Sequence, residues 1–291
     1  MNNRKKYILV DGQGLLYRAF YALPQLTTTQ GQVVNAVYGF TMILIRLLEE
    51  EKPEYMTITF DTPVPTFRHK EFKEYKAHRK KMPDELINQI PLIREIINNY
   101  NIAICLKEGY EADDVIGTLA KEAEKRNCDT IIVTGDKDAF QLISSHTKIM
   151  TTIKGVTEVK IYDEENIRKK YGVGPDKIVD ILALKGDVSD NIPGVPGVGP
   201  KTTLTLLQKF GSLEEIYTQM DKKTEEIKPS LKIKLQKFRD QAFLSKKLAT
   251  LKTDMKLDLS VAKCSRAGYN KTKVVEILEG LGFNTLIARL P

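Results

Sequence analysis

Short apolar runs alternate with amphipathic segments through the first half of the chain. Four apolar runs have the length of a buried strand: Tyr7–Val10, Met56–Phe60, Ile102–Leu106 and Thr130–Val133. Three segments between them carry apolar residues at helical spacing: Ala36–Glu51, Pro83–Tyr100 and Ala112–Arg126. Such alternation predicts an α/β fold with a parallel sheet and helices on both faces.

The pattern changes in the second half. Thr147–Ile153 and Glu158–Ile161 predict two more short strands, joined as an edge hairpin around Lys154–Gly155. From Asp163, a good helix N-cap, helical patterns dominate, with Gly211, Gly280 and Gly282 as breakers. We therefore expect an α/β domain over residues 1–162 and a helical domain over residues 163–291.

Composition narrows the class of protein. The chain has 291 residues, 42% hydrophobic and 29% charged, which excludes wholesale disorder. No apolar run approaches the roughly 20 residues of a membrane helix, and Asp11 interrupts the first run too early for a secretory signal. Cys105, Cys128 and Cys264 are odd in number and widely spaced, as expected for buried thiols of a cytoplasmic protein. The net charge of +7 favours a polyanionic partner.

Acidic residues follow the predicted strands directly. Asp11 follows YILV, Asp61 follows MTITF, and Asp136 and Asp138 follow IIVTG. Because the carboxyl ends of parallel strands meet at one rim, these carboxylates should lie together. Two further groups extend the set, one at the start of the helix after Ile102–Leu106 and one in LKGDVSDNIPG: Glu111, Asp113 and Asp114; Asp187 and Asp190.

Each of these acids alone has a simpler interpretation as a helix cap. Asp138, for example, is placed to cap a helix that contains Phe140 and Leu142. All nine together would repel one another strongly unless cations neutralise them. Oxygen ligands without His or Cys favour Mg²⁺, with Mn²⁺ as a substitute, and nine carboxylates favour two or more ions. Two-metal clusters of this kind catalyse in-line phosphoryl chemistry.

A Gly/Pro-rich stretch precedes a helical pattern in the second half. This hairpin segment, residues 192–202, contains Gly194, Gly197 and Gly199, followed by Lys201 and Thr202. Free backbone amides at a helix N-terminus bind phosphate, and a lysine adds charge there. A Walker A loop is disfavoured because Pro200 separates the last glycine from the lysine. A purely structural turn remains an alternative to the hairpin of a helix-hairpin-helix module.

A basic segment, residues 66–83, lies between two acidic groups in the sequence. It carries seven Lys or Arg against two Glu, with Phe67, Phe72 and Tyr75 interleaved. A solvated surface helix is the simpler interpretation. Its start five residues after Asp61 favours a position over the acidic rim, where cations and aromatic rings hold phosphates and bases.

Several of these motifs resemble one known family. ILVDGQGLLYRAFYAL, ITFDTPVPTFRHKEFKEYKAHR, EGYEADDVIGTLA, TGDKDAFQL and LALKGDVSDNIPGVPGVGPKTTLTLL are similar to the 5′-nuclease domain of bacterial DNA polymerase I, and to phage 5′-exonucleases and flap endonucleases. The resemblance implies a PIN-like nuclease domain with a helical arch at about residues 62–83, then a helical domain with a helix-hairpin-helix at about residues 186–210. It also implies Mg²⁺-dependent, structure-specific 5′-nuclease activity.

The resemblance assigns roles to individual residues. It implies a first metal site of Asp11, Asp61, Glu111, Asp113 and Asp114, and a second of Asp136, Asp138, Asp187 and Asp190. It places cations near the scissile phosphate and DNA contacts in the arch and hairpin: Arg18, Lys76 and Arg79; Phe67, Arg68, Tyr75, Gly194, Gly197, Gly199, Lys201 and Thr202. A K⁺ ion at the hairpin is also implied. Lys80-Lys81 and Val188 depart from the family pattern, which affects arch shape and affinity rather than chemistry.

These roles define the expected substrates and the competing hypotheses. The implied partners are DNA with 5′ ends, flaps or nicks, RNA primers on DNA, and a polymerase module in cis or in trans. We expect a monomer in a bacterial cytoplasm, encoded by the bacterium or by a phage. The main alternative is a catalytically silent DNA-binding module of a polymerase, which usually loses carboxylates. A small-molecule phosphatase would leave the hairpin and the basic segment unexplained.

Overall fold

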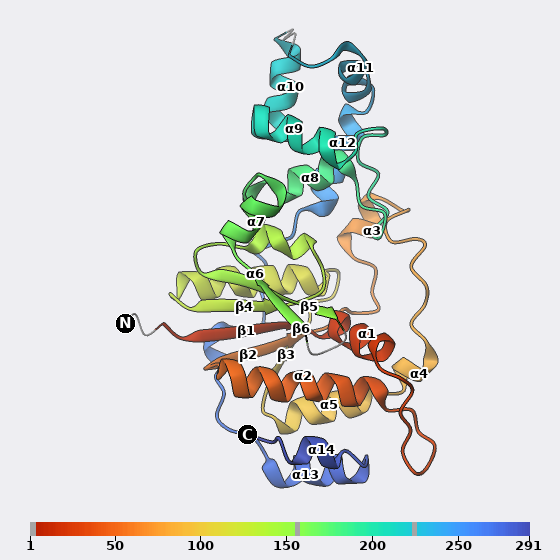
Figure 1. Ribbon diagram of the computed structural model, residues 1–291, viewed down its shortest axis with the longest axis vertical. Helices are drawn as coiled ribbons and strands as arrows, with labels where there is room; N and C mark the ends of the chain where they lie inside the picture. Colours follow the sequence, from red (N-terminus) through yellow and green to blue (C-terminus); the bar gives the residue numbers. More distant parts are fainter. Residues whose placement is uncertain (1–3, 155–157, 223–225) are drawn as a thin grey trace.

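The sheet at the centre of the molecule has six strands in the order β3-β2-β1-β4-β5-β6 (Figure 1). The computed structural model describes residues 4–154, 158–222 and 226–291. The strands, with bounds close to those predicted, are β1 (Lys6–Asp11), β2 (Tyr55–Thr59), β3 (Ala103–Cys105), β4 (Asp129–Val133), β5 (Thr147–Lys154) and β6 (Glu158–Tyr162). Strands β1 to β5 pair in parallel, and β6 is antiparallel to β5. The predicted α/β sheet is confirmed; Gly155 of the predicted turn lies outside the described residues.

Helices cover both faces of the sheet. Below it in Figure 1 lie α2 (Asn35–Glu51) and α5 (Ile90–Asn99), while α6 (Ala112–Lys125) lies above. The central strand shows why both faces must be covered. Tyr7 and Leu9 of β1 lie in the core between the sheet and α6. Ile8 and Val10 lie in the core between the sheet and α2. Successive side chains of a strand point to opposite faces, so an unbroken apolar run is buried on both sides.

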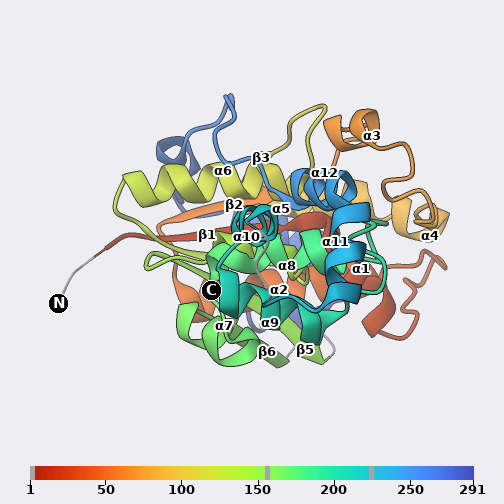
Figure 2. The ribbon, with the colours of Figure 1, turned by 90° about the horizontal axis from the view of Figure 1, so that it is seen from above.

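The second half of the chain forms a stack of helices above the sheet (Figures 1 and 2). Its elements are α7 (Glu164–Tyr171), η2 (Pro175–Lys177), α8 (Ile178–Lys185), α9 (Pro200–Phe210), α10 (Leu213–Asp221), α11 (Pro229–Lys237) and α12 (Arg239–Ala249). Asp163 caps α7 as predicted, because its carboxylate accepts a hydrogen bond of 2.9 Å from the Asn166 amide.

The last segment of the chain leaves this stack and returns to the sheet. It contains η3 (Val261–Cys264), which packs against β2 and α6, and then α13 (Lys271–Gly280) and α14 (Asn284–Ile287), which lie below α2 and α5 in Figure 1. Leu278 is fully buried in the core of that face, and Tyr269 stacks on Tyr100 with 4.8 Å between ring centroids. The predicted helical domain of residues 163–291 therefore needs correction at its end, because apolar residues there complete the α/β core.

Two predicted helical segments are interrupted. The segment Pro83–Tyr100 forms α4 (Asp84–Ile87) and α5, separated around Gln89, whose buried side-chain carbonyl accepts hydrogen bonds from the first amides of α2, those of Ala36 and Val37. The basic segment holds only the short helix α3 (Phe67–Glu71), followed by turns and irregular chain. A continuous helix over residues 66–83 is therefore not observed.

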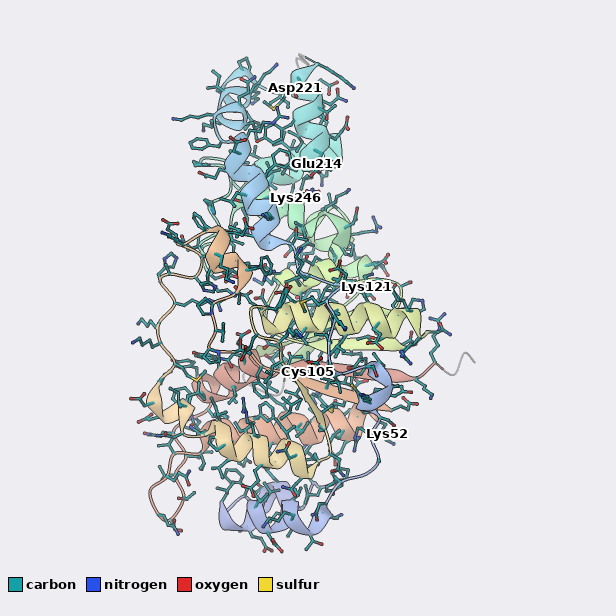
Figure 3. All side chains as sticks on the ribbon, turned by 180° about the vertical axis from the view of Figure 1, so that it is seen from behind. Lys52, Cys105, Lys121, Glu214, Asp221 and Lys246 are labelled. Atoms are coloured by element: carbon teal, nitrogen blue, oxygen red, sulfur yellow. The ribbon has the colours of Figure 1, made fainter. Side chains whose placement is uncertain are left out.

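Two helical elements follow the central strands β1 and β4 of the sheet. Helix α1 (Gly12–Ala22) follows β1, and η1 (Asp138–Leu142) follows β4. The three cysteines are free and buried, as predicted, with Cys105 inside the sheet region (Figure 3). Within the described ranges, no helix combines the length and the apolar character needed to cross a membrane.

Candidate metal and nucleic-acid site

A cleft of about 760 Å³ lies where the parallel strands end. Asp11 after β1, Asp61 after β2, Asp136 after β4 and Asp113 at the start of α6 all line it. The chain between α3 and α4 runs along the same side of the sheet in Figure 1. The structure thus brings four of the predicted carboxylates into one cleft, together with cations of the basic segment.

Three of these acids also accept hydrogen bonds from backbone amides at or near the start of a helix. One oxygen of Asp11 accepts from the Gly14 amide, and one oxygen of Asp61 accepts from the Ala112 amide, each at 2.8 Å. Asp136 accepts from the Asp138 amide at 2.8 Å, so the predicted capping by Asp138 itself is wrong. A cap uses one oxygen of each carboxylate, so capping and metal binding are compatible.

The carboxylates raise one another's pKa values. Burial, followed by the charges of Asp61 and Asp136, raises the pKa of Asp11 to about 6. Burial and the Asp136 charge raise the pKa of Asp138 to about 8. The pKa of Asp113 is raised well above its usual value by burial and by Asp136 and Asp11. A cleft in which several acids resist ionisation is one that divalent cations would stabilise.

Cations of the basic segment form ion pairs with two further predicted carboxylates, Glu111 and Asp190. Lys76 Nζ lies 2.8 Å from Glu111 Oε1 and 3.4 Å from Asp190 Oδ2, and Arg79 pairs with the same Asp190. Burial alone would raise the pKa of Asp190, but the charges of Lys76 and Arg79 outweigh it and hold that pKa below its usual value. These residues therefore lie against the acidic cleft, and their place near a reacting phosphate stays a prediction.

Tyr75 contacts carboxylates from two separate segments, one at the start of α6 and one after α8. Its hydroxyl oxygen lies 3.1 Å from Glu111 Oε2 and 2.9 Å from Asp190 Oδ2, and its side chain is only 2% exposed. A ring so deeply buried cannot stack on a base in this structure, so the predicted DNA contact of Tyr75 does not fit. The next residue, Lys76, has a φ of 54°, and its amide donates to the Asp190 carbonyl. These bonds to the helical stack explain why the basic segment is not one helix.

Asp114 and Arg68 face each other away from the cleft. Both are buried, at 0% and 1% exposure, and they form a bidentate ion pair. Neither residue lines the cleft. The predicted metal ligand Asp114 and the predicted DNA contact Arg68 are thus directed elsewhere, because each satisfies the buried charge of the other.

Arg18 of α1 and Phe67 of the basic segment do not line the cleft. Arg18 lines a neighbouring pocket of about 440 Å³ and donates to the Thr152 carbonyl. Phe67 is half-buried, with its ring centroid 5.8 Å from that of Tyr110. Just after α8, Asp187 accepts hydrogen bonds from the amide and the hydroxyl of Ser189, both at 2.8 Å.

The three glycines of the hairpin segment differ in burial: Gly194 is buried, whereas Gly197 and Gly199 are exposed. The Gly194 amide donates to Ser245 Oγ at 3.0 Å, and its carbonyl accepts from Gln241 Nε2 at 2.7 Å. Gly194 is buried at a φ of 60°, so its predicted contact with DNA does not fit. Gly197 and Gly199 are exposed, and Gly199 is the N-cap of α9.

Lys201 and Thr202 stand in the first turn of α9. Both line a groove of about 400 Å³ together with Lys209, Lys228 and Lys234. A groove with several lysines beside free helix amides has the charge needed to hold a phosphate backbone. The lysines of α11 were not identified from the sequence; only their recurrence in KPSLKIKLQK marks them, and that recurrence also fits a solvated helix.

Thr134 is a further residue beside the acids that the sequence pattern did not single out. Its hydroxyl donates to Asp11 Oδ2 at 3.0 Å and accepts from the Asp136 amide at 3.1 Å, so it ties two cleft carboxylates together. Its position between the β4 apolar run and the TGDKD acids was a usable signal.

The donor set of the cleft fits hard divalent cations. In the part of the chain that the structure describes, no three acidic, His or Cys side chains already stand at ligand distance around one point. However, one Asp113 oxygen is buried without a hydrogen-bond partner, among carboxylates whose pKa values are raised. A buried oxygen atom of this kind requires a partner, and a cation would supply it.

Two features together define the class of protein to which this chain belongs. One is the parallel sheet with acids at its rim, and the other is the helical domain with a Gly-rich hairpin that follows it. The chain belongs to the 5′-3′ exonuclease family. The N-terminal resolvase-like domain of that family matches residues 6–172, and its C-terminal SAM fold matches residues 173–272.

Individual relatives agree with the family. The chain is 49% identical to DNA polymerase I of Bacillus subtilis over 290 residues, covering 100% of this chain and 33% of that protein. It is 40% identical to a 5′-3′ exonuclease of Aquifex aeolicus, covering 92% of this chain and 90% of that protein. The chain thus spans about a third of the length of the DNA polymerase I relatives.

Solved structures show the same fold. T5 5′-exonuclease with bound zinc aligns over 98% of this chain and 97% of its own, with a TM-score of 0.69 and 18% identity. The catalytic core of Rad2 in complex with DNA substrate aligns over 99% and 93%, with a TM-score of 0.64 and 18% identity.

Proposed function

We propose that the chain hydrolyses DNA phosphodiesters near 5′ ends, flaps and nicks, as a Mg²⁺-dependent 5′→3′ exonuclease and flap endonuclease. The observation that carries this proposal is the acidic cleft itself, where raised carboxyl pKa values and an unpartnered Asp113 oxygen face Lys76 and Arg79. Family membership and the hairpin support a nucleic-acid substrate. RNA primers on DNA are included because the mechanism uses only the phosphate backbone.

The acidic residues divide into two metal groups. Asp11, Asp61, Glu111 and Asp113 would hold one ion, and Asp136, Asp138, Asp187 and Asp190 the other. Bound Mg²⁺ or Mn²⁺ would supply a nucleophilic water at neutral pH and Lewis-acid stabilisation of the reacting phosphate. Metal-bound solved structures with the same fold support divalent ions, and one of them, T5 5′-exonuclease, holds zinc.

The side chains of this protein supply the remaining parts of the mechanism. Lys76 and Arg79 stand at the rim, where they offset the charge that builds on the phosphoryl oxygens. Arg18 on α1 lines the adjoining pocket and adds a cation on the other side of the cleft. Gly197, Gly199, Lys201 and Thr202 hold the duplex backbone away from the reacting phosphate, which fixes the distance between duplex and cleavage site.

The hairpin offers limited support for K⁺. The carbonyls of Gly194 and Val195 already accept hydrogen bonds, from Gln241 and from the Val198 amide. An ion there would use the second lone pair of these carbonyl oxygens or other carbonyls, and K⁺ binding stays a prediction.

Cleavage of a defined flap tests the proposed function. A duplex with a 5′ flap, labelled at its 5′ end, is incubated with the protein in Mg²⁺ and in EDTA. We expect short labelled products in Mg²⁺ only. Asp113→Asn is the matched variant, because it removes one cleft charge and should abolish cleavage while still binding duplex. Wild-type protein that binds the flap but never cuts it in Mg²⁺ or Mn²⁺ would instead favour the silent DNA-binding module.

The cellular context follows from the relatives. Because the DNA polymerase I relatives are three times longer, we propose that this nuclease works with a polymerase module, in cis or in trans. We also propose a monomer acting in the bacterial cytoplasm during primer removal and repair, since the DNA polymerase I relatives are bacterial.

A further inference from the structure

The ion pair between Arg68 and Asp114 uses almost every polar atom of both side chains. Arg68 donates to the two Asp114 oxygens at 2.7 and 2.8 Å, and to the carbonyls of Leu248 and Thr250 at 2.7 and 3.0 Å. The Asp114 oxygens also accept from the amides of Lys252 and Glu111, at 2.8 and 3.1 Å. This pair therefore connects three segments of the chain: α3, the N-terminus of α6, and residues 248–252 at the end of α12 and just beyond it.

The two residues flank the functional groups of the cleft in sequence. Asp114 lies next to Asp113 and three residues after Glu111 on α6, and Arg68 begins the basic segment that leads to Tyr75 and Lys76. Arg68 Nη1 also lies 3.5 Å from Glu111 Oε2. A shift of α3 against α6 would therefore move Lys76 and Tyr75 relative to Glu111.

Binding of a metal by Asp114 would conflict with this arrangement. An Asp114 oxygen could reach a metal only by releasing the guanidinium of Arg68, whose side chain is 1% exposed. An unpaired buried guanidinium is strongly destabilising, whereas the pair as it stands is fully hydrogen-bonded. The geometry thus separates Asp114 from the adjacent Asp113, whose unpartnered oxygen faces the other carboxylates.

We propose that Asp114 and Arg68 form a positioning pair for the cleavage reaction, and that neither binds metal or DNA. The pair holds the start of the basic segment on the N-terminus of α6, which sets Lys76 and Tyr75 against Glu111. This inference rests on the proposed nuclease function for its kinetic test, but not for its stability test.

The stability test compares neighbouring acids in the metal-free protein. Asp113→Asn removes a repelling charge, so its midpoint of urea unfolding in EDTA should rise. Asp114→Asn leaves Arg68 without its partner, so its midpoint should fall. A metal ligand at residue 114 predicts the opposite sign for the second variant. A midpoint for Asp114→Asn at or above that of the wild type therefore overturns the proposal, whether or not the protein is a nuclease.

The kinetic test separates positioning from binding. With Asp114→Asn we expect a roughly tenfold to hundredfold lower single-turnover rate at saturating DNA and Mg²⁺, since small displacements of reacting groups have effects of that size. The half-saturating Mg²⁺ concentration and the duplex Kd should stay within about threefold. A shift of the half-saturating Mg²⁺ concentration by tenfold or more, with the full rate restored at high Mg²⁺, identifies a ligand and overturns the proposal.

A second variant keeps the test decisive if Asp114→Asn folds poorly. The double variant Arg68→Gln with Asp114→Asn replaces the ion pair by two amides that can hydrogen-bond to each other. Positioning predicts that the double variant is more stable than Asp114→Asn and recovers part of the lost rate. A change at residue 68 cannot restore a missing metal ligand, so losses that simply add would overturn the proposal.

The control for general destabilisation is the ion pair of Asp180 and Lys246, neither of which lines the cleft. Asp180 is 4% exposed and lies 2.6 Å from Lys246, in the helical stack (Figure 3). Asp180→Asn should lower the urea midpoint but leave the single-turnover rate of folded protein within about twofold. If Asp114→Asn behaves in the same way, with a wild-type rate, the pair is structural only and the positioning role is wrong.

Discussion

Replacing Asp138 by asparagine should stabilise the metal-free protein while it abolishes cleavage. The Asp138 side chain stands at the start of η1, and its pKa is raised to about 8 by burial and by the charges of Asp136, Asp187 and Asp190. The local hydrogen bond at this position comes from the Asp138 amide to Asp136, so it survives the substitution. Asparagine therefore removes the charge without removing a cap.

The expected gain in unfolding free energy follows from the shift in the pKa of Asp138. Each pKa unit corresponds to about 1.4 kcal/mol, so a shift from 3.8 to about 8 corresponds to about 6 kcal/mol. The repulsion is shared with three other carboxylates, which relax when one charge disappears. We therefore expect a gain of roughly half that amount, about 3 kcal/mol, at pH 8.

The sign of the pH dependence is fixed. Well below pH 4 the carboxyl group is protonated in both the folded and the unfolded state and has no effect on stability. As the pH rises, the unfolded chain ionises first, so the wild-type protein loses stability until the pH reaches the folded-state pKa. The advantage of Asp138→Asn should therefore grow between about pH 4 and pH 8 and then level off.

Urea unfolding in EDTA at pH 5 and pH 8 measures this advantage. Asp258→Asn is the control, because the Asp258 side chain is 96% exposed and its loss should change stability by less than about 0.5 kcal/mol. An Asp138→Asn midpoint equal to or below that of the wild type at pH 8 would refute the reasoning. Added Mg²⁺ should stabilise the wild type more than the variant, and only the wild type should cleave a flap.

Three other predictions concern the cations, the hairpin and proton release. Lys76→Ala with Arg79→Ala should reduce the single-turnover rate far more than duplex affinity, and an unchanged rate would remove both from the catalytic residues. Lys201→Ala should weaken duplex binding equally for all sequences and lower the slope of log Kd against log salt by about one unit; an unchanged slope would leave the hairpin purely structural. Mg²⁺ affinity should rise from pH 6 to pH 8 as Asp11 and Asp138 lose protons, and calorimetry in two buffers of different ionisation enthalpy should detect the released protons. Affinity that is independent of pH would contradict the raised pKa values.

The acids at the strand ends could be predicted from the sequence because their positions depend only on the sheet. Asp11 follows Val10, which pairs with Ile58 of β2 and Val133 of β4 in parallel register. Once three parallel strands are recognised, the residues after them must share one rim. The same logic does not require any knowledge of side-chain contacts.

The roles of Asp113 and Asp114 could not be separated in this way. Both stand in the first turn of α6, and only their directions differ. The direction of Asp114 is set by Arg68, which lies 46 positions earlier in the sequence, and by the carbonyls and amides of residues 248–252. Gly194 is a similar case, because its partners Gln241 and Ser245 come from α12. Long-range partners of this kind leave no local pattern.

The hydrophobic cores on both faces of the sheet hold the carboxylates of the cleft close together. The carboxylates repel one another, yet each is attached to a strand or helix end whose apolar residues are almost fully buried, such as Val10 at 1% and Ile58 at 0%. Burial of those side chains is worth about 2 kcal/mol each, and it fixes the backbone whether or not the acids are neutralised. Replacing a cleft acid should therefore leave the sheet intact and change only the charge. Asp114 is the exception, since its charge holds Arg68, and that difference distinguishes a residue of the cleft from one that positions it.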